Sequence, residues 1–511
     1  MGKIVLKIKN WIRQNPKEAI FLGVILLVGA FLRLYRISEY MTFLGDEGRD
    51  AIIVRRLLVN FDPILIGPGT SIGNMYLGPL YYYLMAPALF FANYSPVGPS
   101  VQIALLGVAT VFFVWYIARV WFGKTAGIIA ALFYALAPTV IIYSRSSWNP
   151  NIMPFFSLLT IWGIWKFWQE RKFIWLPLIG MGVAFTLQSH YLGLLLTPVV
   201  AVPWLLTFFK IRKSESVRHF VRNTIYGIIL FLVLMSPIVI FDARHGWRNF
   251  AAMRTFFIER QTTVSARPWK AIPKMPELAQ DITTRLLAGK NETAGKITFL
   301  AMIVLSIFVF AKRNSLNSKT RAAFGLLCLW LAASLIGLGL YKQEIYDHYY
   351  GFFFSAPFLL LGGISQYIVQ STKDIGKIAL FVVLGLLFFV NLQNSPLKYP
   401  PNRQLQRSIE VAKKIEQEAG KEKFNLAVIA ERNYEDGYQY FLEKMETPVI
   451  DIDAQRPETI TNQLFVVCEM PKEKCQPTTN PKAEVANFGW SKIAGEWEVF
   501  GATVYKLVHS D

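Results

Sequence analysis

Charged residues are scarce in this sequence: Asp, Glu, Lys and Arg make up only 17% of its 511 residues. A soluble domain usually carries about 25% charged residues. The deficit is concentrated in long apolar runs such as 21–31, 126–143 and 377–392, so the chain is not one large soluble core. Because a charge or an unpaired backbone group is costly in hydrocarbon, these runs predict membrane-spanning helices.

The apolar runs predict eleven transmembrane helices, with ends accurate to about 2–4 residues. No small-residue cleavage site follows the first run, so we expect no cleavable signal peptide. The predicted spans are 19–36, 99–118, 125–142, 152–168, 174–188, 191–209, 223–241, 296–311, 322–341, 351–369 and 378–394.

Basic residues orient these spans. If the spans alternate, six basic groups fall on one side, and the positive-inside rule makes that side the cytoplasm. We therefore predict a multi-pass protein of the cell (plasma) membrane with a cytoplasmic N-terminus and an extracytoplasmic C-terminal domain. The groups are Lys3, Lys7, Lys9, Arg13 and Lys17; Arg119 and Lys124; Arg171 and Lys172; Lys210, Arg212, Lys213, Arg218 and Arg222; Lys312, Arg313, Lys319 and Arg321; and Lys373 and Lys377.

Ionisable residues are almost absent from the spans themselves. Arg33 lies near a helix end and His190 at a turn, and the other polar residues gather in the outer loops. Charges inside spans mark transport paths, and transporters show inverted repeats and broken helices that we do not find convincingly here. The pattern favours a site at the outer membrane surface over a channel.

The formal net charge of +19 does not indicate nucleic-acid binding. The basic residues lie mostly in short loops beside apolar spans, where they suit anchoring to anionic lipid head groups. We expect membrane lipids, and no nucleic acid, as partners.

The outer loops of a membrane domain spanning 1–395 are predicted at 37–98, 143–151, 243–295 and 342–350. Within the first, we expect an amphipathic stretch at 46–60, a Gly/Pro-rich link at 67–79 and an aromatic helix at 80–94. Counting that helix as a span would break the charge pattern. We predict that it lies in the membrane interface, where Tyr81, Tyr82 and Tyr83 would have a wet edge.

The outer loop 243–295 is unusually basic. Its cations either form a solvated surface or bind an anionic head group or phosphate. They include Arg244, Arg248, Arg254, Arg260, Arg267 and Lys270.

The segment 396–511 predicts a small extracytoplasmic α/β domain. We expect a helix at 403–420 that ends at a glycine, strands at 424–431 and 463–469 with a helix at 438–445 between them, and a strand pair within 497–508. The segment has no phosphate-binding glycine loop, metal cluster or nucleophile motif, so we interpret it as an accessory domain.

Cysteine is scarce, with three residues in the chain. Cys328 falls in a span, where we expect a packing role. Cys468 and Cys475 lie close together in the outer domain, where a disulfide can form, and we predict that they form one. A single Cys pair without His is a weak zinc signal.

The sharpest local feature is GDEGRDA at 45–51, directly after the first span. Asp46 and Glu47 could be a cap and a first-turn acid of a helix. A carboxylate beside an apolar membrane face could instead be a general base or a metal ligand. The sequence alone leaves both interpretations open.

The order of these parts resembles a known family. The Asp-Glu pair, PLYYYLMAP at 79–87, the run 111–145 and HYYGFFFSAPFLLLGG at 348–363 resemble GT-C membrane glycosyltransferases, near protein O-mannosyltransferases and aminoarabinose transferases. The resemblance implies an all-α polytopic bundle whose outer loops form the active site. It also implies a sugar donor carried on a polyprenyl phosphate, with no nucleotide sugar and no Rossmann domain.

The resemblance assigns Asp46 as the carboxylate that deprotonates or orients the acceptor hydroxyl, and Glu47 as the second acid of the pair. Asn149 stands in the loop 143–151 where the family often has Asp. An amide is a poorer cation ligand, so a divalent cation is only weakly supported. Arg145 in the same loop could bind the lipid phosphate or serve as an interfacial anchor.

Two further departures concern donor binding. Tyr76–Gly78 replaces the family's basic residue, so another cation must meet the donor phosphate: Arg145 or one from 244–260. His348 and Tyr349 stand where the family commonly has an Arg-Tyr pair. His348 and His190 could each hydrogen-bond the phosphate or sugar, or be structural.

We therefore predict a hexosyl- or pentosyltransferase that moves a sugar from a polyprenyl-phosphate donor to a hydroxyl acceptor on a protein, lipid or envelope glycan. The alternatives are another enzyme of undecaprenyl-linked intermediates, such as a glycan ligase or phosphotransferase, a lipid-linked-sugar transporter or flippase, and a structural or binding protein.

Overall fold

The structure is a computed structural model of the whole chain. It describes residues 2–70, 75–258, 263–265 and 267–510, with the side chains of 2–5 and 257 left out. Arg260, one of the cations expected in the basic outer loop, lies outside the described residues, as does part of the Gly/Pro-rich link.

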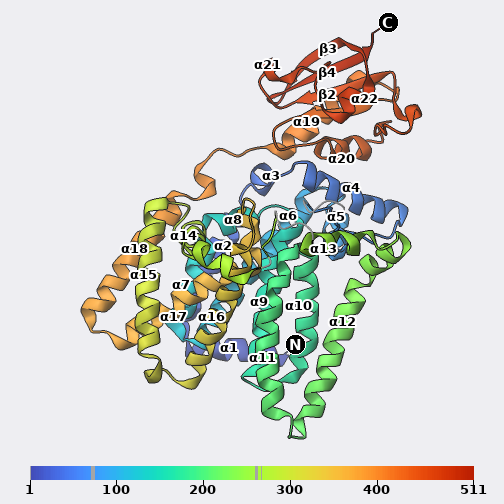
Figure 1. Cartoon of the computed structure of the whole chain (residues 1–511). Coiled ribbons are helices and arrows are strands. Elements are labelled where there is room, and N and C mark those ends of the chain that lie inside the picture. Colours follow the sequence, from blue (N-terminus) through green and yellow to red (C-terminus); the bar gives the residue numbers. More distant parts are fainter. Residues whose placement is uncertain (1, 71–74, 259–262, 266, 511) are drawn as a thin grey trace.

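A bundle of long helices forms most of the molecule (Figure 1), and each of the eleven predicted spans coincides with a helix or a helix pair of it. The predicted polytopic all-α bundle is confirmed. Its helices are α2 (Pro16–Leu34), α6 (Val97–Trp121), α7 (Lys124–Leu136) followed by α8 (Pro138–Tyr143), α9 (Met153–Trp168), α10 (Leu176–Ser189), α11 (Leu196–Ile211), α12 (Ser216–Arg244), α15 (Glu292–Ala311), α16 (Ser318–Gly339), α17 (Ser355–Ser371) and α18 (Asp374–Gln393).

Not every helix of the bundle is long enough to cross a membrane alone. Among the described residues, six are long and apolar enough, or seven if the bent pair formed by η6 (Asp347–Phe353) and α17 is one span. α7 stops early because Pro138 cannot continue it, and the chain resumes as α8. The predicted count of eleven therefore includes short and broken helices.

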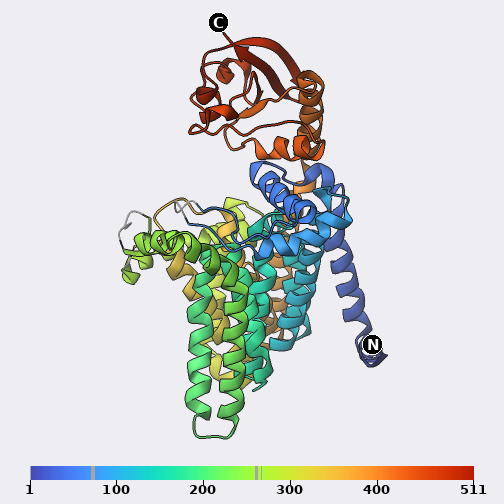
Figure 2. The same cartoon turned by 90° about the vertical axis from the view of Figure 1, so that its right-hand side faces the viewer.

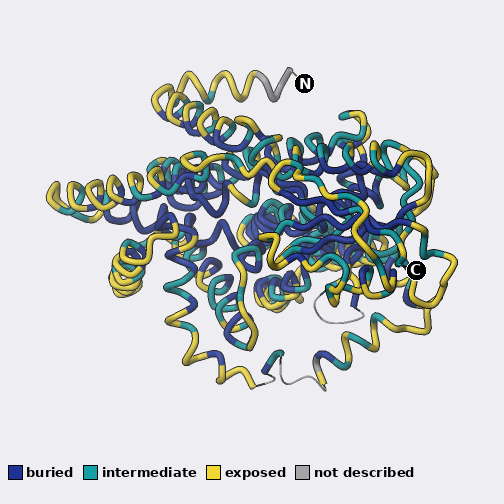
Figure 3. Tube along the Cα trace, turned by 90° about the horizontal axis from the view of Figure 1, so that it is seen from above, coloured by how far each residue is buried: buried dark blue, intermediate teal, exposed yellow. Residues whose placement is uncertain are grey.

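Small residues let neighbouring helices of the bundle approach closely. A Cβ on Gly180 of α10 would lie 2.1 Å from the Gly227 carbonyl oxygen of α12, and one on Gly362 of α17 would lie 2.6 Å from the Ala126 carbonyl oxygen of α7. Close backbone contact of this kind favours helix association in lipid. Seen from above, buried residues fill the centre and exposed ones follow the outer helices (Figure 3).

Short helices gather at one end of the bundle, which we call the outer end. The basic connections α11–α12, α15–α16 and α17–α18, with α1 (Gly2–Gln14), lie at the opposite end (Figure 1). The grouping of these basic segments agrees with the prediction, while their cytoplasmic location stays a prediction. The outer end carries α3 (Ile37–Tyr40), α4 (Gly45–Asn60), α5 (Leu80–Phe91), η1 (Asn149–Ile152), η3 (Tyr191–Leu195), α13 (Arg248–Ile258), η4 (Pro268–Lys274), α14 (Met275–Leu286) and η6.

The expected interfacial helix is α5, whose 12 residues are too few to span hydrocarbon. Its tyrosines differ from the expectation. Tyr81 and Tyr82 are buried, and only Tyr83 is exposed, because α5 packs between α4, α6 and α10. The first two tyrosines therefore face protein and not a wet membrane interface.

The C-terminal segment contains a four-stranded sheet in the order β1-β2-β4-β3. β1 and β2 are parallel, and the other neighbours are antiparallel. β3 begins earlier than predicted because it is an edge strand with mostly exposed side chains, which hides its alternation. Cys468 and Cys475 form the predicted disulfide. The elements are α19 (Gln404–Ala419), β1 (Asn425–Ile429), α20 (Asp436–Lys444), β2 (Gln463–Cys468), α21 (Lys472–Cys475), α22 (Ala483–Phe488), β3 (Ser491–Val499) and β4 (Ala502–His509).

The sheet domain sits directly on the outer end of the bundle, above α3 and α4 (Figure 2). One apolar core joins them, in which Phe43 packs on Tyr440 and Phe441 of α20. The approach is close enough that a Cβ on Gly48 would lie 2.4 Å from the Asp436 and Gly437 backbone. The site described next lies at this contact.

Candidate active site

Helix α4 starts with two backbone N–H groups held by side chains. Leu44 N donates to Glu47 Oε2 (3.0 Å), and Gly45 N donates to Asn433 Oδ1 of the C-terminal domain (2.8 Å). The first N–H groups of a helix have no partner within it, so such bonds stabilise its start. The capping group on Gly45 therefore comes from a remote part of the chain.

Glu47 is the buried member of the predicted acidic pair, with 6% of its surface exposed. Burial raises its pKa to about 7, and the charges of Asp46 and Asp50 add to that effect. Its bond to Leu44 corresponds to the capping alternative that the sequence left open. A catalytic role for Glu47 stays a prediction.

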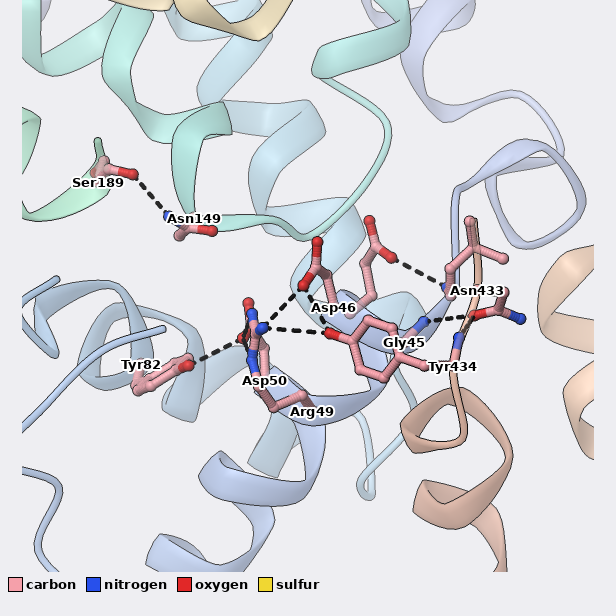
Figure 4. Close-up of polar contacts among 11 residues, drawn as sticks. Gly45, Asp46, Arg49, Asp50, Tyr82, Asn149, Ser189, Asn433 and Tyr434 are labelled. Atoms are coloured by element: carbon pink, nitrogen blue, oxygen red, sulfur yellow. Dashed lines mark hydrogen bonds and ion pairs between the residues drawn. The ribbon is translucent and has the colours of Figure 1, made fainter. Parts of the chain in front are cut away.

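Asp46 is the accessible member of the pair, with 41% of its side chain exposed. Its Oδ1 accepts hydrogen bonds from Arg49 Nη1 (2.8 Å) and from the Tyr434 hydroxyl (2.7 Å). Oδ2 has no hydrogen-bond partner among the described residues, and Figure 4 shows one carboxylate oxygen pointing away from Arg49 and Tyr434. One oxygen is thus held while the other is available to a hydroxyl.

Arg49 connects Asp46 to a second carboxylate that the sequence reasoning missed. Asp50 is fully buried, and its Oδ1 accepts from Arg49 Nη2 (2.8 Å), Arg49 Nε (3.1 Å) and the Tyr82 hydroxyl (3.0 Å). Burial raises the pKa of Asp50, although Arg49 opposes that effect. Both residues lie in GDEGRDA, where spacings of three and four residues place them on the Asp46 face of the helix.

The predicted loop residues Arg145 and Asn149 are buried and bonded to backbone. Arg145 donates to the carbonyls of Leu32 (2.8 Å) and Tyr35 (2.7 Å) at the end of α2, and lies over the Tyr40 ring. Asn149 Nδ2 donates to the Ser189 carbonyl (2.7 Å; Figure 4). Only Nε of the Arg145 guanidinium lacks a partner among the described residues.

His190, His348 and Tyr349 come together in one aromatic cluster with Trp148. The ring centroids of His190 and Tyr349 are 4.9 Å apart, and those of His348 and Trp148 are 4.6 Å apart. Burial lowers the pKa of His190 to about 3, and the nearby His348 adds to the effect, so His190 is neutral at pH 7. Burial lowers the pKa of His348 to about 4, while the charges of Asp347 and Asp46 oppose that effect.

A cavity of about 450 Å³ opens next to this aromatic cluster. Its walls are mostly apolar side chains of α10, η3, α12, α13 and α16, and Tyr191 separates it from His190, with ring centroids 4.4 Å apart. No Lys or Arg lines it among the residues that the structure describes. Asp242 at its edge accepts hydrogen bonds from Asn249 N and Phe250 N and so caps α13.

The described residues contain no group of three His, Cys, Asp or Glu side chains placed to hold a metal ion. Asp46 and Asp50 instead share the charge of Arg49. Two exposed cations of the loop 243–295, Lys290 and Arg285, pair with Asp347 (2.8 and 3.5 Å) at the start of η6.

Sequence comparison relates part of this chain to mannosyltransferases. Residues 78–241 match the dolichyl-phosphate-mannose-protein mannosyltransferase family. A putative mannosyltransferase of Bacillus subtilis (strain 168), YkcB, is 25% identical over 237 residues. That match covers 45% of this chain and 31% of YkcB, so it spans less than a third of the relative's length.

Two solved structures are similar over most of the chain. ArnT from Cupriavidus metallidurans bound to undecaprenyl phosphate has a TM-score of 0.60 at 12% identity, covering 96% of this chain and 97% of that one. The archaeal oligosaccharyltransferase AglB from Archaeoglobus fulgidus, in complex with an inhibitory peptide and a dolichol-phosphate, has a TM-score of 0.55 at 12% identity, covering 89% and 70%. The resemblance inferred from the sequence is confirmed.

Proposed function

We propose that this chain, which has the fold of the GT-C membrane glycosyltransferases and resembles them in sequence, transfers a sugar from a polyprenyl-phosphate donor to an acceptor hydroxyl. The observation that carries the proposal is the Asp46 carboxylate at the outer end of the bundle, which is exposed and has one oxygen bound by Arg49 and Tyr434 and the other without a partner among the described residues. The donor class is supported by the undecaprenyl phosphate and dolichol-phosphate bound to the two similar structures.

In the proposed reaction Asp46 acts as general base. Oδ2 accepts the proton of the acceptor hydroxyl while the hydroxyl oxygen attacks the anomeric carbon of the donor sugar. A new glycosidic C–O bond forms, the bond from the anomeric carbon to the phosphate oxygen breaks, and polyprenyl phosphate leaves with the electron pair. The exposed position of Asp46 allows an acceptor to reach it.

We assign the apolar cavity to the first isoprene units of the donor. Its volume and lining suit an apolar chain that enters from the membrane. The uncharged His190, with Tyr349 and His348, would form the aromatic wall against which the sugar lies. Arg285 and Lys290 are exposed cations paired with Asp347 of η6, and we propose them for the donor phosphate.

Arg145 and Asn149 fit a different role from the one that the resemblance implies. Their polar groups already bind carbonyls of α2 and α10. We propose that they fix the loop 143–151 below the substrate. A glycan ligase or phosphotransferase would use the same cavity, and its products separate it from our proposal.

The test is transfer of labelled sugar from a polyprenyl-phosphate donor by the purified protein in liposomes. Asp46→Asn keeps the shape of the side chain but removes the base, so turnover should fall by about 10²–10⁴-fold. Asp62→Asn is the matched control, since Asp62 is exposed just beyond α4 and should be neutral. Near-normal turnover by Asp46→Asn would remove Asp46 from catalysis. Release of a phosphorylated glycan would instead favour the phosphotransferase.

A further inference from the structure

The C-terminal domain reaches the proposed base directly through Tyr434. The Tyr434 hydroxyl donates to Asp46 Oδ1 (2.7 Å) and also accepts from Arg49 Nη1 (3.2 Å). The ring packs flat on the start of α4: a Cβ on Gly45 would lie 2.5 Å from it. Tyr434 therefore contacts the carboxylate through its hydroxyl and the helix through its ring.

A hydrogen-bonded network behind Tyr434 fixes its position. The neighbouring Asn433 accepts from both Gly45 N (2.8 Å) and Tyr434 N (2.9 Å). Its Nδ2 donates to Glu469 Oε1 (2.5 Å), which also accepts from the Tyr438 hydroxyl (2.5 Å). Because Glu469 follows strand β2, the sheet of the C-terminal domain supports the hydroxyl that meets Asp46.

We infer that Tyr434 is a positioning residue for Asp46, supplied by the C-terminal domain to a site otherwise built by the membrane domain. The inference rests on the proposed function and deepens it. The C-terminal domain is then a working part of the transfer site and not only an accessory to it. Both hydrogen bonds to Asp46 fall on Oδ1, which orients Oδ2 towards the open side.

A positioning role follows from which oxygen is engaged. If the Tyr434 hydroxyl occupied the position of the acceptor substrate's hydroxyl, it would bind Oδ2 of Asp46, the oxygen that must take the proton. The two donors share Oδ1 instead, and they come from two different parts of the chain. Fixing a reacting group from two directions reduces the motion that would otherwise slow the chemical step.

The test uses Tyr434→Phe, which keeps the ring against Gly45 and removes only the hydroxyl. A hydrogen bond to a charged group is strong, so we expect kcat to fall by about 10–100-fold with the acceptor KM unchanged. Tyr440→Phe is the matched control. Its hydroxyl also bridges the two domains, donating to the Tyr94 carbonyl (2.6 Å), and that carbonyl keeps Lys444 Nζ as a second donor (3.1 Å).

The double variant Asp46→Asn/Tyr434→Phe shows whether Tyr434 acts through Asp46. We expect it to turn over no more slowly than Asp46→Asn alone, because groups that act as a unit are not additive. Normal kcat in Tyr434→Phe, an equal loss in Tyr440→Phe, or full additivity would each overturn the inference while leaving Asp46 as the base. Normal turnover by Asp46→Asn would instead overturn the proposed function and the inference with it.

A second measurement does not depend on transfer. Thermal unfolding of wild type, Asp46→Asn, Tyr434→Phe and the double variant should show that the two substitutions are coupled. Independent effects on the melting temperature would mean that the Tyr434–Asp46 bond does not form in the membrane protein, and would overturn the inference.

Discussion

Arg33 in the bundle and Arg49 in the layer above it are held in different ways. Arg33 in α2 is fully buried and donates to the carbonyls of Gly29 and Ala135 (both 3.1 Å) and Tyr134 (3.4 Å). The Tyr134 carbonyl needs a donor, since Pro138 four residues later has no N–H. Arg49 in α4 lies instead between the carboxylates of Asp46 and Asp50.

The difference distinguishes an arginine that supports the helices from one that lies at the proposed site. Arg33 completes backbone hydrogen bonding and forms no ion pair among the described residues. Arg49 instead pairs with two carboxylates, of which Asp46 stays exposed. The outer end therefore holds carboxylates whose charge is shared with Arg49 and of which one is accessible.

The largest effect should be seen in the labelling of introduced cysteines from the two sides of the membrane, which tests whether the two ends of the molecule lie on opposite sides. Single cysteines introduced at Ser216 and Ser318 should react with a membrane-impermeant thiol reagent only from the cytoplasm, and one at Thr478 only from outside. The positive-inside rule gives this direction. Labelling should be all or none in oriented cells, and reaction at Thr478 from the cytoplasm would invert the topology.

Substituting Arg49 and Arg33 in turn compares what each contributes to stability. Arg49→Met leaves Asp50 as an uncompensated buried carboxylate, so we expect a loss of about 3–5 kcal/mol in the free energy of unfolding. Arg33→Met leaves carbonyls without donors but strands no charge, and should cost about 1–3 kcal/mol. Denaturant unfolding in detergent measures both. Equal losses would mean that the two regions hold charge in the same way.

The disulfide of the C-terminal domain should matter less, and only for stability. Replacing Cys468 and Cys475 with Ser removes a short covalent loop, which typically contributes about 2–3 kcal/mol. Sugar transfer should be unaffected, because Glu469, although it lies within this loop, is also held by its backbone bond to Ile429 of β1 and by its bonds to Asn433 and Tyr438. Intact-mass analysis with and without reductant establishes the bond. Two free thiols in the mature protein would contradict it.

The smallest effect should be a pH dependence of the contact between α4 and α20. Burial raises the pKa of both Glu47 and Asp436 to about 7. The unfolded chain loses these protons at lower pH than the folded one, so stability should fall as pH rises from about 4.5 to about 7 and then level off.

Glu47→Gln tests the origin of that slope, since the amide oxygen can still accept from Leu44 N. The melting temperature of this variant should depend less on pH than that of the wild type, by a few degrees between pH 5 and pH 8. The control is Glu446→Gln, a change in the exposed turn after α20. A slope unchanged in Glu47→Gln would mean that Glu47 does not titrate in this range.

The sequence was most informative where a single stretch carries the signal. Apolar runs located the helices, since hydrophobicity and backbone satisfaction in lipid are local requirements. Asp46 could be singled out because it follows the first span. Arg145 could not be placed, because its partners are carbonyls of α2 more than a hundred positions away.

Tyr434 and Asn433 illustrate the same limit at the site. They lie 388 positions from the residues that they contact, in a segment without any catalytic motif. No periodicity or spacing could connect them to GDEGRDA. The stretches meet through the close approach of Gly48 to Gly437 and the packing of Phe43 on α20, and composition does not reveal contacts of this kind.

The distance between Tyr434 and Asp46 along the chain has a consequence for biosynthesis. The acidic loop is made early, whereas every helix from α5 to α18 must be synthesised before residue 434 exists. A ribosome-bound or misinserted intermediate thus displays its carboxylate with only Arg49 beside it. Tyr434, the second donor to Asp46, is added only when the C-terminal domain has been made and has packed on α4. A complete site therefore indicates that the helices between α4 and the C-terminal domain have assembled correctly.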